Sequence, residues 1–190
     1  MIVLASQSPR RRQLLDMLGI RHVVDPANVE ERQETGEAPE AFAARIARQK
    51  ALQVVTRHGG TPVLAADTVV VVDGDTLGKP RSPEEACQML ARLAGRDHRV
   101  VTAVALAAGA RVHQRCDVTQ VWFRPISPEE IQAYVATGEP LDKAGAYGVQ
   151  GLGSVLVDRI DGDFFGVMGL PLRLVIDLLA EAGVPYSLTR

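Results

Sequence analysis

A chain of 190 residues is long enough to bury one hydrophobic core and short for two independent ones. Hydrophobic residues make up 46% of it and charged residues 23%, which is typical of a globular protein. The formal net charge of −2 gives no reason to expect a nucleic-acid or anionic-membrane surface, so any affinity for anions must come from a local cluster of cations.

The cysteines and the apolar segments bear on the cellular compartment. Cys87 and Cys116 have neither CxxC spacing nor a disulfide-framework pattern, which predicts reduced thiols in the cytosol. Residues 1–5 are apolar, but the basic run follows them, which is the reverse of the order in a secretory signal. The longest nearly apolar segment, residues 100–110, is too short to span a bilayer. We therefore expect a cytoplasmic protein that binds neither nucleic acid nor membrane.

Apolar periodicity, capping residues and glycines predict strands alternating with helices along the chain. The expected elements up to the first hairpin are a strand over 2–5, a helix from Ser8-Pro9 to Gly19, an acidic loop over 25–38, a helix over 39–57 with Phe42, Ile46, Leu52 and Val55 facing inward, strands over 62–66 and 69–72, and a turn at Asp73-Gly74. The later ones are a helix from Ser82-Pro83 to Gly95, strands over 100–107 and 112–123, a helix from Ser127-Pro128 to near Gly138, a glycine-rich loop over 145–153, a strand over 155–160 and a helix over 171–182. This order predicts an α/β fold in one domain, residues 1–190, with a mixed twisted sheet, helices on both faces and a central cleft between two lobes.

The turn before the first predicted helix carries Ser6, Ser8 and three consecutive arginines at 10–12. Cations at a helix N-terminus oppose the helix dipole, so this arrangement is locally unfavourable. Phosphate binding explains it, because arginine forks match phosphate oxygens and the helix end favours anions. A solvated arginine surface explains it equally well, and the segment alone leaves both interpretations open. It is not a Walker A loop, since the GxxxxGK[ST] pattern is absent from the sequence.

Other residues that could carry chemistry give weaker signals singly. Asp67 follows the apolar run at 63–66 and precedes four valines, so it lies at an expected strand end, where a carboxylate can hold Mg²⁺ or orient a water. A turn or capping aspartate is the simpler interpretation of that residue in isolation. Lys50 on the long helix and Lys79 in a tight loop are, singly, ordinary surface cations, and Glu31 belongs to an acidic loop that solvation alone would explain.

Taken together, several segments resemble the Maf family of nucleotide pyrophosphatases over nearly the whole chain. They are LASQSPRR at 4–11, ARQKA at 47–51, ADT at 66–68, GKP at 78–80, DKAGAYGVQG at 142–151 and VMGLP at 167–171. The resemblance implies a Maf/ITPase-like fold and cleavage of a nucleoside triphosphate between its α and β phosphates. It also implies a divalent metal, Mg²⁺ or Mn²⁺, and leads us to expect a homodimer.

The same resemblance assigns roles to individual residues. It implies that Asp67 is the general base or the carboxylate that anchors the metal, with Glu31 as a tentative second metal ligand. Phosphate binding is implied for four residues: Ser8, Arg10, Lys50 and Lys79.

Three further positions bear on the choice of base. Members similar to the dTTP/UTP pyrophosphatases carry Arg, Thr and Gln at specificity positions, which match Arg11, Thr68 and Gln150 here. The Trp, Gln and Glu of the 7-methyl-GTP subgroup are absent from those positions. An amide such as that of Gln150 can both donate and accept at a pyrimidine edge. Arg12 keeps the simpler interpretation of a surface cation.

The expected function is therefore hydrolysis of dTTP and UTP to the monophosphate and pyrophosphate. Two alternatives stay open on the sequence. The enzyme could clear modified pyrimidine nucleotides, such as 5-methyl or pseudouridine triphosphates. Alternatively, the protein could bind nucleotides without hydrolysing them and regulate cell division or septum formation.

Overall fold

The computed structural model of the chain describes residues 1–188 and has an α/β fold, as the sequence predicted. Up to the first hairpin, its elements are β1 (Ile2–Leu4), α1 (Pro9–Met17), β2 (His22–Val24), α2 (Pro39–Val55), β3 (Val63–Val72) and β4 (Asp75–Leu77). They continue with α3 (Pro83–Leu93), β5 (Asp97–Ala108), β6 (Arg111–Phe123), α4 (Pro128–Ala136), three 3₁₀ turns η1 (Glu139–Asp142), η2 (Ala144–Ala146) and η3 (Gly151–Leu156), β7 (Val157–Asp161), α5 (Phe164–Val167) and α6 (Leu172–Glu181). Within residues 1–188, no helix is long and apolar enough to cross a membrane.

The strands form a mixed sheet in the order β2-β1-β3-β5-β6-β7, with β4 paired to β3. β1 runs parallel to both of its neighbours, and Val3 lies opposite Val23 on one side and Val63 on the other. Parallel neighbours need long crossover connections, which α1 and α2 supply. The β3–β4 and β6–β7 pairs are antiparallel. The predicted mixed sheet is therefore confirmed.

The chain divides into two compact units. The first contains residues 1–67, residues 102–117 and the C-terminal segment from Gly169. The second contains residues 68–101 and 118–168. The expectation of one domain with two lobes around a cleft stays a prediction.

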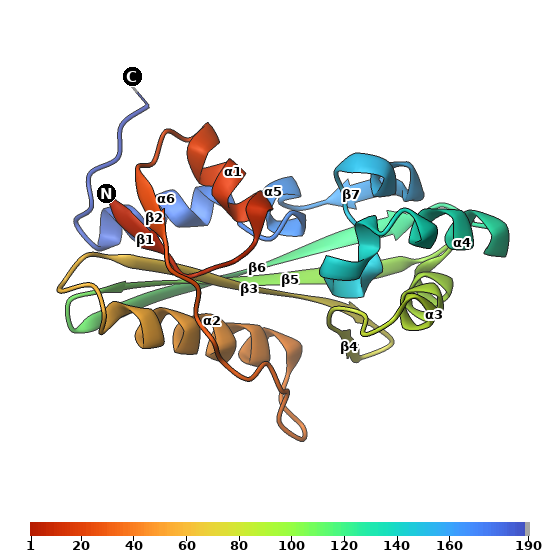
Figure 1. The fold of residues 1–190 in the computed structure, drawn as a ribbon, viewed down its shortest axis with the longest axis horizontal. Helices are drawn as coiled ribbons and strands as arrows, with labels where there is room; N and C mark the ends of the chain where they lie inside the picture. Colours follow the sequence, from red (N-terminus) through yellow and green to blue (C-terminus); the bar gives the residue numbers. More distant parts are fainter. Residues whose placement is uncertain (189–190) are drawn as a thin grey trace. The chain divides into compact units, whose positions relative to one another are not determined.

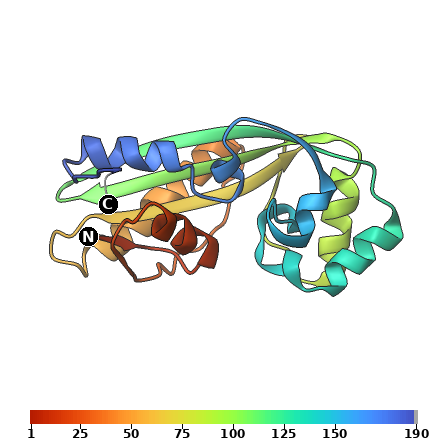
Figure 2. The same cartoon turned by 90° about the horizontal axis from the view of Figure 1, so that it is seen from above.

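In the first unit, helices cover both faces of the strands. α2 lies on one face, and α1 and α6 lie on the other (Figures 1 and 2). α2 buries Phe42, Ile46, Lys50 and Val54, one residue per turn, which is the spacing of a single helix face. The prediction that Leu52 faces inward is wrong. It lies out of phase with that stripe, and 41% of its surface is exposed.

The prediction of two strands bracketing Asp67 and Thr68 is also wrong, because β3 is continuous from Val63 to Val72. Asp67 lies in its middle rather than at a strand end, and it is buried. A charged side chain does not stop a strand when the charge has a buried partner, and here the Lys50 ammonium hydrogen-bonds to the Asp67 carboxylate. Asp67, which was predicted to lie at a strand end, is therefore a buried carboxylate within the sheet.

Local signals in the second unit predicted its elements well. Asp73 and Gly74 both have positive φ, of 54° and 83°, as a two-residue type I′ hairpin requires, and they join β3 to β4. Ser82 and Ser127 cap α3 and α4, as predicted. The apolar faces of these two helices belong to one core cluster, which also contains Phe123. Two short elements, β2 and α5, were not predicted.

Candidate functional site

The N-terminal turn of α1 is organised by two serine hydroxyls. Ser8 is the N-cap, and its Oγ accepts the N–H of Arg11 at 3.5 Å. The Oγ of the buried Ser6 accepts the N–H of Ser8 at 3.2 Å. Arg10 is half-buried in the same first turn. The turn therefore presents a helix N-terminus, a hydroxyl and arginine side chains together, which is a suitable arrangement for an anion.

Arg11 ties this turn to two other segments of the first unit. Its Nε donates to the carbonyl of Gly169 at 2.8 Å, just before α6. Its Nη1 donates to the carbonyl of Ala66 in β3 at 2.9 Å and to the Oγ of Ser6 at 3.2 Å. Burial lowers the pKa of Arg11, while the nearby Asp67 carboxylate opposes that shift. The role of Arg11 in base choice stays a prediction, and these contacts give it an anchoring role as well.

Lys50, Asp67 and Glu31 form a compact charged cluster. The Nζ of Lys50 lies 2.7 Å from Oδ1 of Asp67 and 2.6 Å from Oε1 of Glu31. Lys50 is 8% exposed and Asp67 is 4% exposed, whereas Glu31 is exposed. Reading Lys50 as an ordinary surface cation is therefore wrong. Its place on the buried face of α2 directs its ammonium at a carboxylate inside the sheet.

The electrostatics of this cluster favour proton acceptance by Asp67. Burial raises the pKa of the Asp67 carboxyl, and the neighbouring Glu31 acts in the same direction. The Lys50 ammonium opposes the rise by charge and by its hydrogen bond. A carboxylate with a raised pKa is a stronger base than one in water, which suits it to accept or hold a proton of a water molecule.

The oxygen atoms of the cluster also fit a divalent cation. Asp67 and Glu31 both lie against the Lys50 ammonium, so two carboxylates, which are hard anionic ligands, already lie close together around one positive charge. Within residues 1–188, no group of three or more His, Cys, Asp or Glu side chains forms a metal cage. Mg²⁺ commonly binds one or two carboxylates and completes its shell with water and substrate phosphates. The donor set therefore suits a metal shared with a phosphorylated ligand.

The remaining predicted site residues belong to the second unit. Thr68 is half-buried and follows Asp67 along β3. Lys79 is exposed in the segment between β4 and α3, and Gln150 is exposed directly before η3. Their substrate-binding and specificity roles stay predictions, as do the phosphate-binding roles of Ser8, Arg10 and Lys50.

Two features of the site region were not predicted. One is the set of acceptors for Arg11, because the carbonyls of Ala66 and Gly169 are far from it in sequence and carry no sequence signal. The other is the pair Tyr134 and Glu139, whose side chains hydrogen-bond to each other and to the glycine-rich loop. Glu139 precedes Pro140 and the glycine cluster, and this nearness in sequence is a weak indication that its carboxylate could contact the loop.

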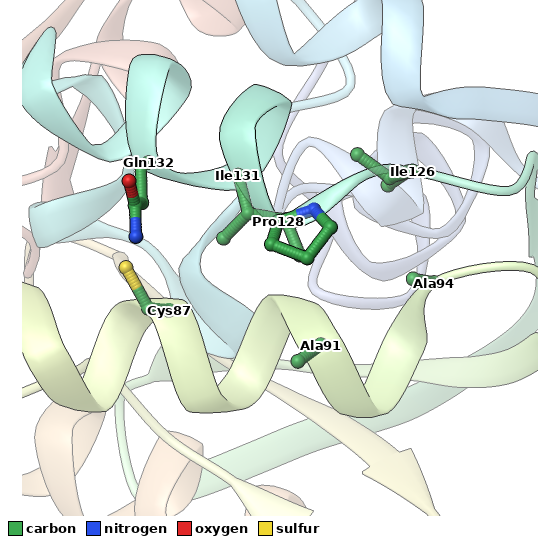
Figure 3. A pocket seen from close by; sticks show the side chains of 7 residues that line it. All are labelled: Cys87, Ala91, Ala94, Ile126, Pro128, Ile131 and Gln132. Carbon is green, nitrogen blue, oxygen red and sulfur yellow. The ribbon is translucent and has the colours of Figure 1, made fainter.

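A pocket of about 250 Å³ lies between α3 and α4 in the second unit (Figure 3). It is lined by Cys87, Ala91, Ala94, Ile126, Pro128, Ile131 and Gln132. The side chains of Cys87 and Gln132 point toward each other at one end of it. No charged side chain is among the residues that line it, so it does not suit a triphosphate. None of the predicted site residues lines this pocket.

Comparison with known proteins places the chain in a family. A model described as Maf-like protein matches residues 1–182. Curated relatives named dTTP/UTP pyrophosphatase, from Syntrophomonas wolfei and Myxococcus xanthus, are 48% and 50% identical to this chain. The matches cover 95% and 97% of this chain, and 96% and 94% of those proteins.

A solved structure shares the fold. The HAM1 protein from Coxiella burnetii is 19% identical, with a TM-score of 0.51 over 95% of this chain and 98% of that one. At this identity the likeness concerns the arrangement of helices and strands alone. Family membership follows from the match over residues 1–182 and from the identity to the curated relatives: the chain belongs to the Maf family.

Proposed function

We propose that this protein hydrolyses dTTP and UTP between the α and β phosphates, releasing the nucleoside monophosphate and pyrophosphate. The relatives named dTTP/UTP pyrophosphatase support this substrate class at 45–50% identity over nearly their whole length. The observation that carries the proposal is the buried Asp67 carboxylate, held by Lys50 beside Glu31. It lies in the same unit as the cationic first turn of α1.

The phosphates are bound by the first turn of α1 and by cationic side chains. The N–H groups at the helix N-terminus, the hydroxyl of Ser8 and the guanidinium of Arg10 attract phosphate oxygens. Lys79 adds a point charge in the second unit. As the bond from the α-phosphorus to the bridging oxygen breaks, negative charge grows on the departing pyrophosphate, and these cations stabilise it.

Asp67 acts on the water. Its carboxylate orients a water molecule toward the α-phosphorus and accepts the proton that the water loses as it attacks. Lys50 fixes the orientation of this carboxylate through the hydrogen bond to Oδ1. Asp67 and Glu31 are also the residues that would hold Mg²⁺ or Mn²⁺, and such an ion, when bound, neutralises phosphate charge.

In this proposal, three residues select the nucleobase of the substrate: Arg11, Thr68 and Gln150. The Gln150 amide is exposed and offers both a donor and an acceptor, so it can pair with the edge of a pyrimidine. The same three residues would accept a 5-methyl or other modified pyrimidine. Kinetics on canonical and modified triphosphates decide between these substrates, and the quantity to compare is kcat/KM.

Product identity tests the proposal directly. With dTTP, the expected products are thymidine monophosphate and pyrophosphate, and in ¹⁸O-labelled water the label is expected in the monophosphate. EDTA is expected to abolish the reaction. Diphosphate and inorganic phosphate as products would contradict cleavage between the α and β phosphates. Tight binding of dTTP with metal present and no turnover would instead favour the nucleotide-binding regulator. A cytoplasmic location stays a prediction from the cysteine pattern and the apolar segments, and a homodimer stays a prediction of the resemblance.

A further inference from the structure

The glycine-rich loop carries Gln150 on a backbone that turns sharply. Gly151 has a φ of 73°, in the left-handed region that favours glycine. A Cβ built on Gly148 would lie 3.0 Å from the carbonyl oxygen of Gln150, so the loop folds back closely on itself. The exposed Gln150 side chain extends from this tight segment.

One carboxylate holds the loop on the C-terminal side of Gln150. Oε2 of Glu139 accepts the N–H of Leu152 at 2.9 Å, and Oε1 accepts the N–H of Gly153 at 2.9 Å. Oε1 also accepts the hydroxyl of Tyr134 at 2.8 Å. Both oxygens of Glu139 are therefore engaged, and two of their partners are consecutive loop amides.

The phenol of Tyr134 holds the loop on the other side. Its oxygen accepts a hydrogen bond from the N–H of Gly148 at 3.1 Å, and its hydroxyl donates a hydrogen bond to Oε1 of Glu139. The anchored amides of Gly148 and Leu152 thus lie two residues before and two residues after Gln150. We call Tyr134 and Glu139 together the loop clamp.

The glycines of the loop are needed for the clamp to approach. A Cβ on Gly151 would lie 2.7 Å from Oε2 of Glu139. A Cβ on Gly153 would lie 2.4 Å from the Tyr134 hydroxyl oxygen and 2.5 Å from the carbonyl oxygen of Gly148. All three separations are too short for a carbon–oxygen contact, so a side chain at either position would displace the clamp. These two glycines are therefore accounted for by contacts inside the protein.

The charges in the clamp agree with its hydrogen bonds. Burial opposes ionisation of Glu139, but the N–H groups of Gly153 and Leu152, the Tyr134 hydroxyl and nearby Lys143 together lower its pKa. Burial raises the pKa of Tyr134, which keeps its proton available to Glu139. An anionic acceptor and a neutral donor are the states in which all four bonds form.

We propose that Glu139 and Tyr134 are positioning residues for base selection, because they fix the backbone on both sides of Gln150 and so set the direction of its amide. This inference rests on the proposed function, in which Gln150 meets the pyrimidine. A fixed amide pairs with one arrangement of donors and acceptors, whereas a mobile one would adapt to several bases.

Amide exchange measured by NMR tests the clamp without any substrate. Glu139→Gln keeps the shape but turns an NH₂ group toward a loop N–H or toward the Tyr134 hydroxyl, and Tyr134→Phe removes the hydroxyl. Exchange at Leu152 and Gly153 in the first variant, and at Gly148 in the second, is expected to be faster by about tenfold, the equivalent of one hydrogen bond. Glu129→Gln is the matched control, because Glu129 is an exposed carboxylate in the first turn of α4. Unchanged loop exchange in both clamp variants would overturn the proposal.

Kinetics separate positioning from simple stabilisation. In both clamp variants, KM for dTTP is expected to rise by about tenfold with kcat changed less than about twofold, because binding of the base is lost and the chemistry at phosphorus is kept. The ratio of kcat/KM for dTTP to that for dGTP should fall by a similar factor. Equal losses for both nucleotides, or a fall confined to kcat, would overturn the base-selecting role. A wild-type protein that releases no pyrophosphate from dTTP would contradict the proposed function instead, and the exchange result would still stand.

Discussion

Replacing Lys50 with methionine removes the cation that lies 2.7 Å from the buried Asp67 carboxylate. The two side chains are 10% and 6% exposed, so water cannot replace the lost ammonium. Removing one partner of a buried ion pair typically costs about 3–5 kcal/mol. In a chain of this size, each kcal/mol lowers Tm by about 2–4 °C. We therefore expect the Lys50→Met variant to melt roughly 6–20 °C below the wild type at pH 8.

The loss should depend on pH in a defined direction. Burial raises the folded-state pKa of Asp67 above its unfolded value of about 3.9, and without Lys50 that pKa rises further. Between the two pKa values the folded protein holds more protons than the unfolded chain. Stability is therefore full below the unfolded pKa and falls as pH rises through the folded pKa, by at most about 1.4 kcal/mol per pH unit. Lowering the pH of the variant from 8 to 5 is expected to return part of its lost stability.

Thermal unfolding followed by circular dichroism from pH 5 to pH 8 measures this effect. The double variant Lys50→Met, Asp67→Asn should recover most of the stability at pH 8, because the uncompensated charge is gone. Arg48→Met is the matched control, since Arg48 is exposed on the same helix. A loss that is equal at pH 5 and pH 8, and that persists in the double variant, would show that packing of the lysine stem, and not its charge, accounts for the cost.

Four further outcomes are expected. Asp67→Asn should lower kcat for dTTP by about 10²–10⁴, measured as pyrophosphate release, and near-wild-type turnover would remove this residue from the role of base. Gln150→Glu should lower kcat/KM for dTTP by about tenfold, because the amide donor is lost; an equal loss with dGTP would argue against base reading. Arg11→Lys should destabilise the fold by about 1–3 kcal/mol in urea titration, because a lysine cannot reach both backbone acceptors of the fork, and an unchanged midpoint would refute the anchoring role. Burial lowers the pKa of His98 to about 4, and its ring hydrogen-bonds to the Tyr147 hydroxyl. NMR at pH 5.5 should therefore find a neutral imidazole, and a ring that titrates near 6.5 would contradict its burial.

Elements with strong local signals could be predicted from the sequence. A serine cap followed by proline and glutamates marks the starts of α3 and α4. The cap residues accept hydrogen bonds from N–H groups of the same first turn, so the signal lies within a few residues of sequence. The Asp73-Gly74 hairpin is likewise set by the backbone conformation of two residues. β2 has no such signal. Its three residues become a strand because β1 offers a parallel partner, which is a contact distant in sequence.

The residues of the candidate site also differ in how far the sequence predicts their positions. Lys50 stands four residues after Ile46 and four before Val54, so its buried position could have been read from the periodicity of α2. That reading would have indicated a cation in need of a buried partner. The identity of that partner depends on the packing of α2 against β3, which periodicity does not contain. Glu31 is harder still, since it comes from an irregular segment, and its contact with Lys50 is set by tertiary structure alone.

The two groups of functional residues are stabilised by different kinds of interaction, and this has a consequence for mutation. Asp67 depends on a buried ion pair with Lys50, so under the proposed mechanism a change there would alter the charge at the reacting phosphate for every nucleotide. The loop that carries Gln150 has backbone amides held by Glu139 and Tyr134, so under our proposal a change in the loop clamp would alter the direction of one amide and leave the phosphate chemistry intact. Losses at Lys50 should therefore be equal for dTTP and dGTP, whereas losses at Glu139 should be larger for dTTP. The ratio of kcat/KM values for the two nucleotides, measured in both variants, distinguishes a site built from separable parts from one in which every residue affects every step.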